Sequence, residues 1–145
     1  MCVLRAAGAD FDVDAFLATS SLEACATFEK GQLRFLTKPD GKHRDRSGFN
    51  ADVSMKEWSD LDGQIQDAKA FVSANEDELR RLRAFPGVEL VELDFPIYLR
   101  IGTNDVAVQS DRLPADLLLA AGSLGIDIVV TVWPDGGPSD VDTRS

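Results

Sequence analysis

The sequence predicts a single α+β domain, in which one long and two short helices pack on one face of a mainly antiparallel sheet of about five to seven strands. Stretches with the period of two that marks half-buried strands alternate with stretches at the spacing of amphipathic helices. The chain of 145 residues has the length of one domain, and its 44% hydrophobic content suffices for a core. We therefore expect the domain over residues 1–134 and a flexible acidic tail over 135–145.

Short strands and one short helix are expected in the first third of the chain. The Lys30-Gly31 turn supplies a glycine that can adopt a positive φ between two strands. Asp12 or Asp14 can cap a helix over 15–18, because short polar side chains accept hydrogen bonds from the exposed N–H groups of a first turn. A polar, basic loop is expected over 41–48. The expected strands are residues 2–7, 25–28, 33–36 and 49–53.

Helix signals dominate the middle of the chain. Apolar residues at 61, 65, 68 and 72 recur at helical spacing, behind a capping pattern formed by Ser59 and Asp62. Asn75 offers a second helix start, which either breaks the long helix or kinks it. Pro86-Gly87 ends the helical region, because proline cannot continue the hydrogen-bond ladder.

The last third is expected to add a hairpin, a short helix and a central strand. Apolar and polar residues alternate over 88–101, which indicates a strand with one buried and one solvated face, and Pro96 indicates an edge or a bulge. A turn should lead into a second hairpin strand over 106–109. A short helix follows over 115–121, and 126–133 is apolar on both faces, as in a central strand.

Charge is unevenly distributed within a net charge of −10. Residues 30–46 contain six basic and two acidic residues, whereas residues 52–78 contain eight acidic and two basic ones. A strongly acidic chain is poorly suited to nucleic acid, since phosphate contacts need a basic face. No stretch approaches the roughly 18 apolar residues that cross a bilayer, and no secretion signal is evident. We expect no nucleic-acid or membrane partner, and a cytoplasmic location.

Residues with obvious chemistry are few. Cys2 and Cys25 are expected to be small buried residues in a reducing compartment, and a disulfide would require their strands to be neighbours. One histidine and two remote cysteines lack the spacing of a zinc site. Phosphate-binding glycine motifs and the nucleophile elbow are absent. The sequence predicts no catalytic residue, no metal and no cofactor, and favours a protein without enzymatic activity.

Two surface sites are predicted to bind partners. The acidic helical segment would attract a basic protein by charge. Its candidate protein-binding residues are Asp60, Asp62, Asp67, Glu76, Asp77 and Glu78. The basic loop would bind an anion, because arginines fork onto phosphate or carboxylate and Gly48 allows close backbone approach. Its candidate anion-binding residues are Lys42, His43, Arg44 and Arg46.

Other interpretations of these polar and aromatic residues stay open. The basic loop could instead pair with acids of the neighbouring helix. In an enzyme, His43 would be the candidate base, with Asp45 to orient it. Trp58 is expected to pack on the helix start, and Trp133 in the core or at its rim. The outward residues of the 88–101 strand either line a binding face or form a solvated surface. These residues are Glu92, Asp94, Tyr98 and Arg100.

Several segments are similar to those of known small proteins. They are an N-terminal strand and residues 11–17 (FDVDAFL), 30–31, 47–49, 61–72, 93–95 and 124–128. With these segments, residues 1–134 resemble small bacterial proteins of domain families of unknown function, some of which look like immunity proteins that neutralise a toxin. The resemblance implies a protein-binding function, and it carries over no functional residue.

Three functions follow as hypotheses. The first is a non-enzymatic, immunity-type protein-binding module that uses its acidic surface. The second is a homodimeric module without chemistry, joined through an exposed strand edge or the apolar side of the 88–101 hairpin. The third is a small anion- or ligand-binding enzyme centred on the loop 42–48.

Overall fold

The computed structural model describes residues 1–35, 37–102 and 105–134, so the expected tail at 135–145 lies outside the described residues. The described strands are β1 (Val3–Gly8), β2 (Ala26–Phe28), β3 (Ser47–Asp52), β4 (Leu90–Tyr98) and β5 (Asp127–Trp133). The described helices are α1 (Val13–Leu17), α2 (Leu61–Ala74), α3 (Glu76–Ala84) and α4 (Ala115–Ser123).

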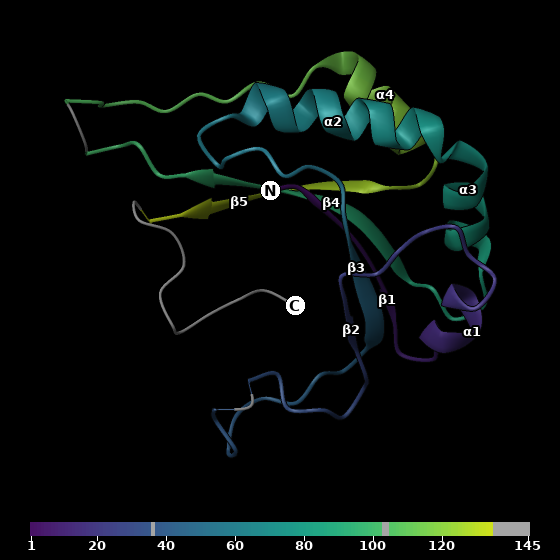
Figure 1. Ribbon diagram of the computed structural model, residues 1–145. Coiled ribbons are helices and arrows are strands. Elements are labelled where there is room, and N and C mark those ends of the chain that lie inside the picture. The colour runs from purple at the N-terminus through teal and green to yellow at the C-terminus, as the bar shows by residue number, and fades with distance from the viewer. Residues whose placement is uncertain (36, 103–104, 135–145) are drawn as a thin grey trace.

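The strands form one sheet in the order β2-β3-β1-β4-β5. Three of the four pairings are antiparallel, and only β4 and β5 run parallel, with α4 in the crossover between them. All four helices lie on one side of this bent sheet, which leaves its hollow side without helices (Figure 1). The predicted α+β class is confirmed. The described residues form four helices, not three, because Asn75 separates α2 from α3.

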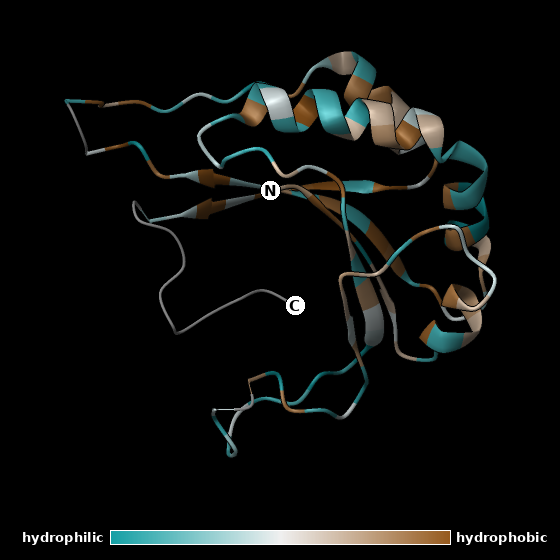
Figure 2. Cartoon of the chain, in the orientation of Figure 1, coloured by the Kyte–Doolittle hydropathy of each residue, from teal (hydrophilic) through white to brown (hydrophobic). Residues whose placement is uncertain are grey.

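The core fills the space between the sheet and the helices. Alternate residues of each strand point into it, such as Leu4 of β1 and Leu93 of β4, which are fully buried. Phenylalanine rings extend the core towards α1, where Phe16 and Phe49 stack with their centroids 5.8 Å apart. Apolar side chains therefore concentrate on the inner faces of sheet and helices (Figure 2).

The helix boundaries follow local capping chemistry. Asp12 is the N-cap of α1, where its carboxylate accepts a hydrogen bond of 3.1 Å from the Ala15 N–H, as predicted. The N-cap of α2 is Asp60 and not Ser59, since the Asp60 carboxylate accepts the Gly63 N–H at 2.8 Å. Asn75 donates its side-chain amide to the Phe71 carbonyl and ends α2.

Two strand positions differ from the prediction. β4 lies inside the sheet, between β1 and β5, although Pro96 suggested an edge. Pro96 lies beyond the last β1 partner of β4, the Val3–Asp94 pair, so its missing N–H breaks no bond between these strands. β5 is an edge strand and not a central one, and several of its side chains are exposed.

Two predicted strands do not form among the described residues. The 106–109 segment is irregular and is tied to β4 by Gln109, whose side-chain amide donates to the Tyr98 carbonyl. In the 33–36 segment, Leu33 forms only an isolated bridge with His43. Position 36 lies outside the described residues. Neither segment forms the continuous ladder of a strand. Side-chain bonds of Gln109 hold the first, and one bridge with a few backbone bonds to the returning chain holds the second.

No helix of the described residues is both long and apolar enough to cross a membrane.

Candidate functional site

The helix-free face of the sheet carries a buried charge network. Arg5 points out of this face, between Asn50 of β3 and Glu92 of β4. Its Nη1 atom lies 2.9 Å from a Glu92 carboxylate oxygen and 3.5 Å from one of Asp94, and its Nε donates to the Asn50 side-chain oxygen at 3.1 Å. One guanidinium group therefore faces two carboxylates.

This network corrects the prediction of a solvated face on β4. Glu92 and Asp94 are only 5% and 6% exposed. Arg5 covers both carboxylates from β1, and the Thr131 hydroxyl of β5 donates to Asp94 at 2.6 Å. Glu92 and Asp94 alternate with apolar residues as predicted, but they face partners on neighbouring strands instead of water. Of the other two predicted outward residues, Tyr98 is half-buried, and Arg100 is exposed beyond the end of β4.

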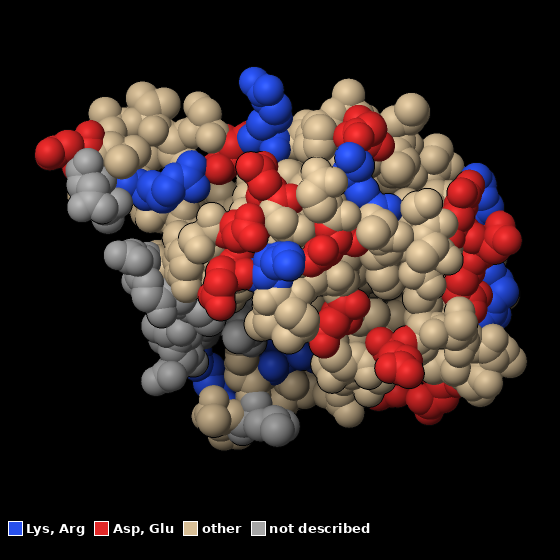
Figure 3. Space-filling model, turned by 45° about the horizontal axis from the view of Figure 1, so that its top comes forward, with Lys and Arg blue, Asp and Glu red and all other residues tan. Residues whose placement is uncertain are grey.

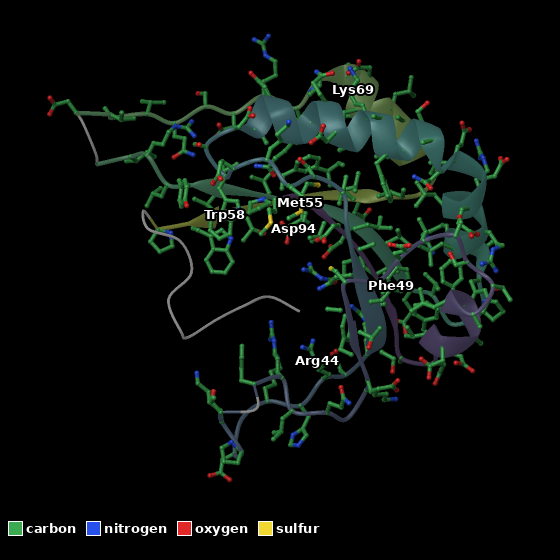
Figure 4. The ribbon with its side chains drawn as sticks, viewed as in Figure 1. Arg44, Phe49, Met55, Trp58, Lys69 and Asp94 are labelled. Carbon is green, nitrogen blue, oxygen red and sulfur yellow. The ribbon has the colours of Figure 1, made fainter. Side chains whose placement is uncertain are left out.

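The basic loop between β2 and β3 folds back on itself as a narrow arm. Backbone bonds join its two sides: the Arg34 N–H donates to the Lys42 carbonyl at 3.0 Å, and the Arg44 N–H donates to the Gln32 carbonyl at 2.8 Å. Arg34 therefore lies on the outgoing segment of the arm, and Arg44 lies on the returning segment. Both arginines are thereby brought to the helix-free face of the sheet, where Figure 4 shows Arg44.

A pocket of about 100 Å³ lies between this arm and the sheet. Phe28 forms part of its wall, and the Arg44 guanidinium lies 4.6 Å from the centre of the Phe28 ring. Gly48 leaves room for that ring, since a Cβ atom at this position would lie 2.6 Å from it. We call this the anion pocket. Its charged lining residues are Arg5, Arg34, Lys42, Arg44, Asp45 and Arg46.

Two arginine nitrogens at this site are buried without a partner. Arg34 Nε and Arg44 Nη1 are both inaccessible to solvent, and neither has a hydrogen-bond partner among the described residues. Burial, together with the nearby positive charges of Arg34 and Arg5, lowers the pKa of Arg44. Buried donors without acceptors are rare in folded proteins, and each one needs an explanation.

The structure brings all four predicted anion-binding residues to this pocket. Lys42, His43, Arg44 and Arg46 all line it. Arg46 also lies 3.6 Å from the Glu89 carboxylate, which is the one ion pair of the arm among the described residues. His43 is exposed and makes no described hydrogen bond to Asp45, the residue expected to orient it.

Sequence reasoning missed the pocket's Arg5 and Arg34. The sequence predicts Arg5 within a strand of small apolar residues and Arg34 within a strand of a hairpin. The only signal for Arg34 was its position within the basic segment 30–46. For Arg5, a lone arginine within an apolar strand was a signal that a buried acid should lie on a neighbouring strand.

The predicted acidic protein-binding residues lie along α2 and α3, where basic residues accompany them (Figure 3). Several of the carboxylates have intramolecular roles. Asp60 caps α2, and Asp67 accepts the Ser54 hydroxyl at 2.7 Å. Glu76 pairs with Arg80, and Glu78 pairs with Arg81. Asp62 and Asp77 have no hydrogen-bonding or ionic partner within the described part of the chain, and both are exposed.

Three aromatic side chains gather at the other end of the helix-free face. Trp58 stacks on Trp133 with ring centroids 5.6 Å apart, and its centroid lies 5.3 Å from that of Tyr98. Trp58 thus packs against β4 and β5, and not only on the start of α2 as predicted. Trp133 lies at the rim of the fold, which is one of its two predicted positions.

The remaining predictions concern thiols, metals and apolar surface. Both thiols are free: Cys2 is buried as expected, but Cys25 is exposed at an edge of the sheet, and β3 separates its strand from β1. Within 1–35, 37–102 and 105–134, no three His, Cys, Asp or Glu side chains gather as metal ligands would. Exposed Val130 and Val132 lie on the edge strand β5.

The chain matches no protein-family model, and comparisons with curated proteins and with solved structures find no match. The resemblance to immunity-type families remains a prediction.

Proposed function

We propose that this protein binds an anionic ligand, and that a phosphate or carboxylate group occupies the anion pocket between the arm and the sheet. The observation that carries the proposal is the pair of buried, unpartnered nitrogens on Arg34 and Arg44. An anion seated between the two arginines, after a small shift of the arm that opens both nitrogens, would accept from both and would offset the repulsion among the clustered guanidinium groups. A volume of about 100 Å³ suits a single small group and not a whole large ligand.

The geometry also supports a fixed orientation for the bound group. The Phe28 ring supports the Arg44 guanidinium from below, and backbone bonds hold both sides of the arm. A planar guanidinium held in this way can present two N–H groups to one oxyanion. Binding without a chemical step is the simplest function of such a pocket, since His43 makes no described hydrogen bond that would orient it.

Calorimetric titration with inorganic phosphate tests the proposal. We expect saturable binding to the wild type, and at least a roughly tenfold loss of affinity in Arg44→Gln, because one charge-assisted hydrogen bond contributes about 1.5–3 kcal/mol. Arg80→Gln is the control, since it removes the same charge from an exposed residue of α3. Equal affinity in both variants, or no saturable binding to the wild type, would overturn the proposal.

The acidic-surface hypothesis has weaker structural support. A basic partner would compete for carboxylates that already cap a helix or pair with arginines, such as Asp60 and Glu78. Asp62 and Asp77 are exposed and neither cap a helix nor pair with a basic residue among the described residues. An immunity-type role agrees with the proposed anion site where the partner presents its own acidic or phosphorylated group to the anion pocket.

A homodimer is the second candidate, favoured by one specific feature. β5 leaves one edge of the sheet open, and Val130 and Val132 are exposed beside that edge. Such an edge can pair with a second copy. Light scattering should then give a mass of twice the chain at micromolar concentration, and a monomer would remove this candidate.

We also propose a cytoplasmic location, because two unbridged thiols suit a reducing compartment.

A further inference from the structure

The aromatic end of the helix-free face contains a second pocket, separate in its chemistry from the anion pocket. Its volume is about 190 Å³. We call it the aromatic pocket. Its lining residues are Met1, Val3, Arg5, Asp52, Trp58, Asp94, Pro96 and Trp133. Stacked indole rings and carboxylates therefore meet in one hollow, beside Asp94 and Trp58 in Figure 4.

The strand register places the two carboxylates on either side of one apolar residue. Val3 of β1 pairs with Asp52 on β3 and with Asp94 on β4, so all three side chains share the same face and the same row. Strands lie about 4.8 Å apart, which puts the two aspartate Cα atoms roughly 10 Å from each other. This spacing leaves room above Val3 for a small group in contact with both carboxylates.

The charges around this row are not balanced by the neighbouring side chains. Arg5 is nearer to Glu92 than to Asp94, and a single guanidinium group serves both carboxylates. Asp52 is exposed and has no cationic partner among the described residues. The amino group of Met1, which also lines the pocket, donates to the Lys56 carbonyl at 2.9 Å, and burial lowers its pKa.

We propose that the aromatic pocket binds a small alkylated ammonium ion, held against the stacked Trp58–Trp133 pair and by the carboxylates of Asp52 and Asp94. Ring faces attract cations through their quadrupole, and tryptophan does so best. The pocket is smaller than the about 300–1,000 Å³ of drug-sized ligand sites, so the occupant is a small ion or a small headgroup. This inference does not depend on the anion pocket.

Tryptophan fluorescence gives a local readout, because both tryptophans of the chain line this pocket. The probe is choline chloride, compared with sodium chloride at equal ionic strength. We expect a saturable change of emission with choline. The uncharged analogue of choline, in which a carbon atom replaces the nitrogen, should bind at least about tenfold more weakly, because a desolvated cation–π contact contributes about 2 kcal/mol.

Two variants of equal charge separate a specific carboxylate contact from a general field effect. Asp52→Asn removes an exposed carboxylate that lines the pocket, and we expect choline affinity to fall several-fold. Asp127→Asn removes an exposed carboxylate from β5 that does not line it, and affinity should be unchanged. Equal binding of the neutral analogue, equal affinity in both variants, or no saturable change with choline would each overturn the inference. Phosphate binding measured on the same samples reports on the anion pocket independently.

Discussion

The Arg44 guanidinium lies over the Phe28 ring, 4.6 Å from its centre. This contact joins the arm to the sheet, since Phe28 belongs to β2 and Arg44 to the loop that follows. The ring occupies space that Gly48 leaves open on the neighbouring strand β3. A glycine, an aromatic ring and an arginine from three segments thus form one stack, and the ring and the arginine line the anion pocket.

Phe28→Leu should weaken phosphate binding without unfolding the chain. Leucine keeps the apolar contact with β3 but removes the ring face that supports Arg44. A cation–π contact of about 0.5–1 kcal/mol corresponds to a roughly two- to fivefold loss of affinity, measurable by calorimetry. Phe71→Leu is the control, because that partly buried ring belongs to α2 and lies outside the pocket lining. An unchanged affinity in Phe28→Leu would show that the stack has no part in binding.

Arg5→Met should be among the more destabilising single changes on the helix-free face. It leaves Glu92 and Asp94 buried without their cation, and breaking a buried pair in this way costs about 3–5 kcal/mol. Denaturant unfolding measures the free energy of unfolding. Arg80→Met, at an exposed ion pair, should cost under about 1 kcal/mol. Similar losses in the two variants would mean that the Arg5 network does not act as a buried unit.

Glu78 should make the stability of the fold depend on pH. Its hydrogen bond with Arg81, followed by its bonds with Ser21 and Ser20, lowers the pKa of Glu78 in the folded chain. A lowered folded pKa contributes stability that is fully present above the unfolded value of about 4.3 and is lost as pH falls through the folded value. Glu78→Gln should therefore cost about 1–3 kcal/mol at neutral pH and nothing at low pH.

The control for Glu78 is Asp77→Asn, an exposed neighbour with no partner among the described residues. Its effect on the free energy of unfolding should be small, because only its favourable position in the first turn of α3 is lost. A Glu78→Gln cost that persists unchanged into acid would contradict the assigned role of this carboxylate.

The two thiols should differ in reactivity. Cys25 is exposed, so iodoacetamide should modify it in the native chain, whereas buried Cys2 should react only after unfolding. Partial desolvation and the charge of Asp52 raise the pKa of the Cys25 thiol. The rate of its alkylation should therefore still increase above about pH 8.5, the pKa of an ordinary thiol. Mass spectrometry of the native chain should show one label, and Cys25→Ser should abolish it. Native labelling of Cys2 would contradict its burial.

Local features of the fold were predictable from the sequence, because they depend on nearby residues. Asp12 caps a helix through its own side chain, and Asn75 ends α2 through a bond four residues back. The prediction of β5 as a central strand was wrong. Its apolar composition indicates burial in general, but the neighbours of a strand are set by the path of the whole chain.

The functional site was predictable only in part for the same reason. Lys42, His43, Arg44 and Arg46 are close in sequence, and their clustering could be read directly. Arg5 reaches them only through the pairing of β1 with β3, and Trp58 meets Trp133 only because β5 lies beside β4. Contacts between distant segments carry no local sequence signal, and both pockets consist mainly of such contacts.

Side-chain NMR of the arginine guanidinium N–H groups during a titration with inorganic phosphate tests the central claim most directly. We predict that the signals of the Arg34 Nε–H and the Arg44 Nη1–H shift saturably with a single shared dissociation constant, while the guanidinium signals of Arg80 on α3 stay in place. Uniform small shifts of all arginines, or no shift at Arg34 and Arg44, would show that these buried nitrogens do not receive an anion.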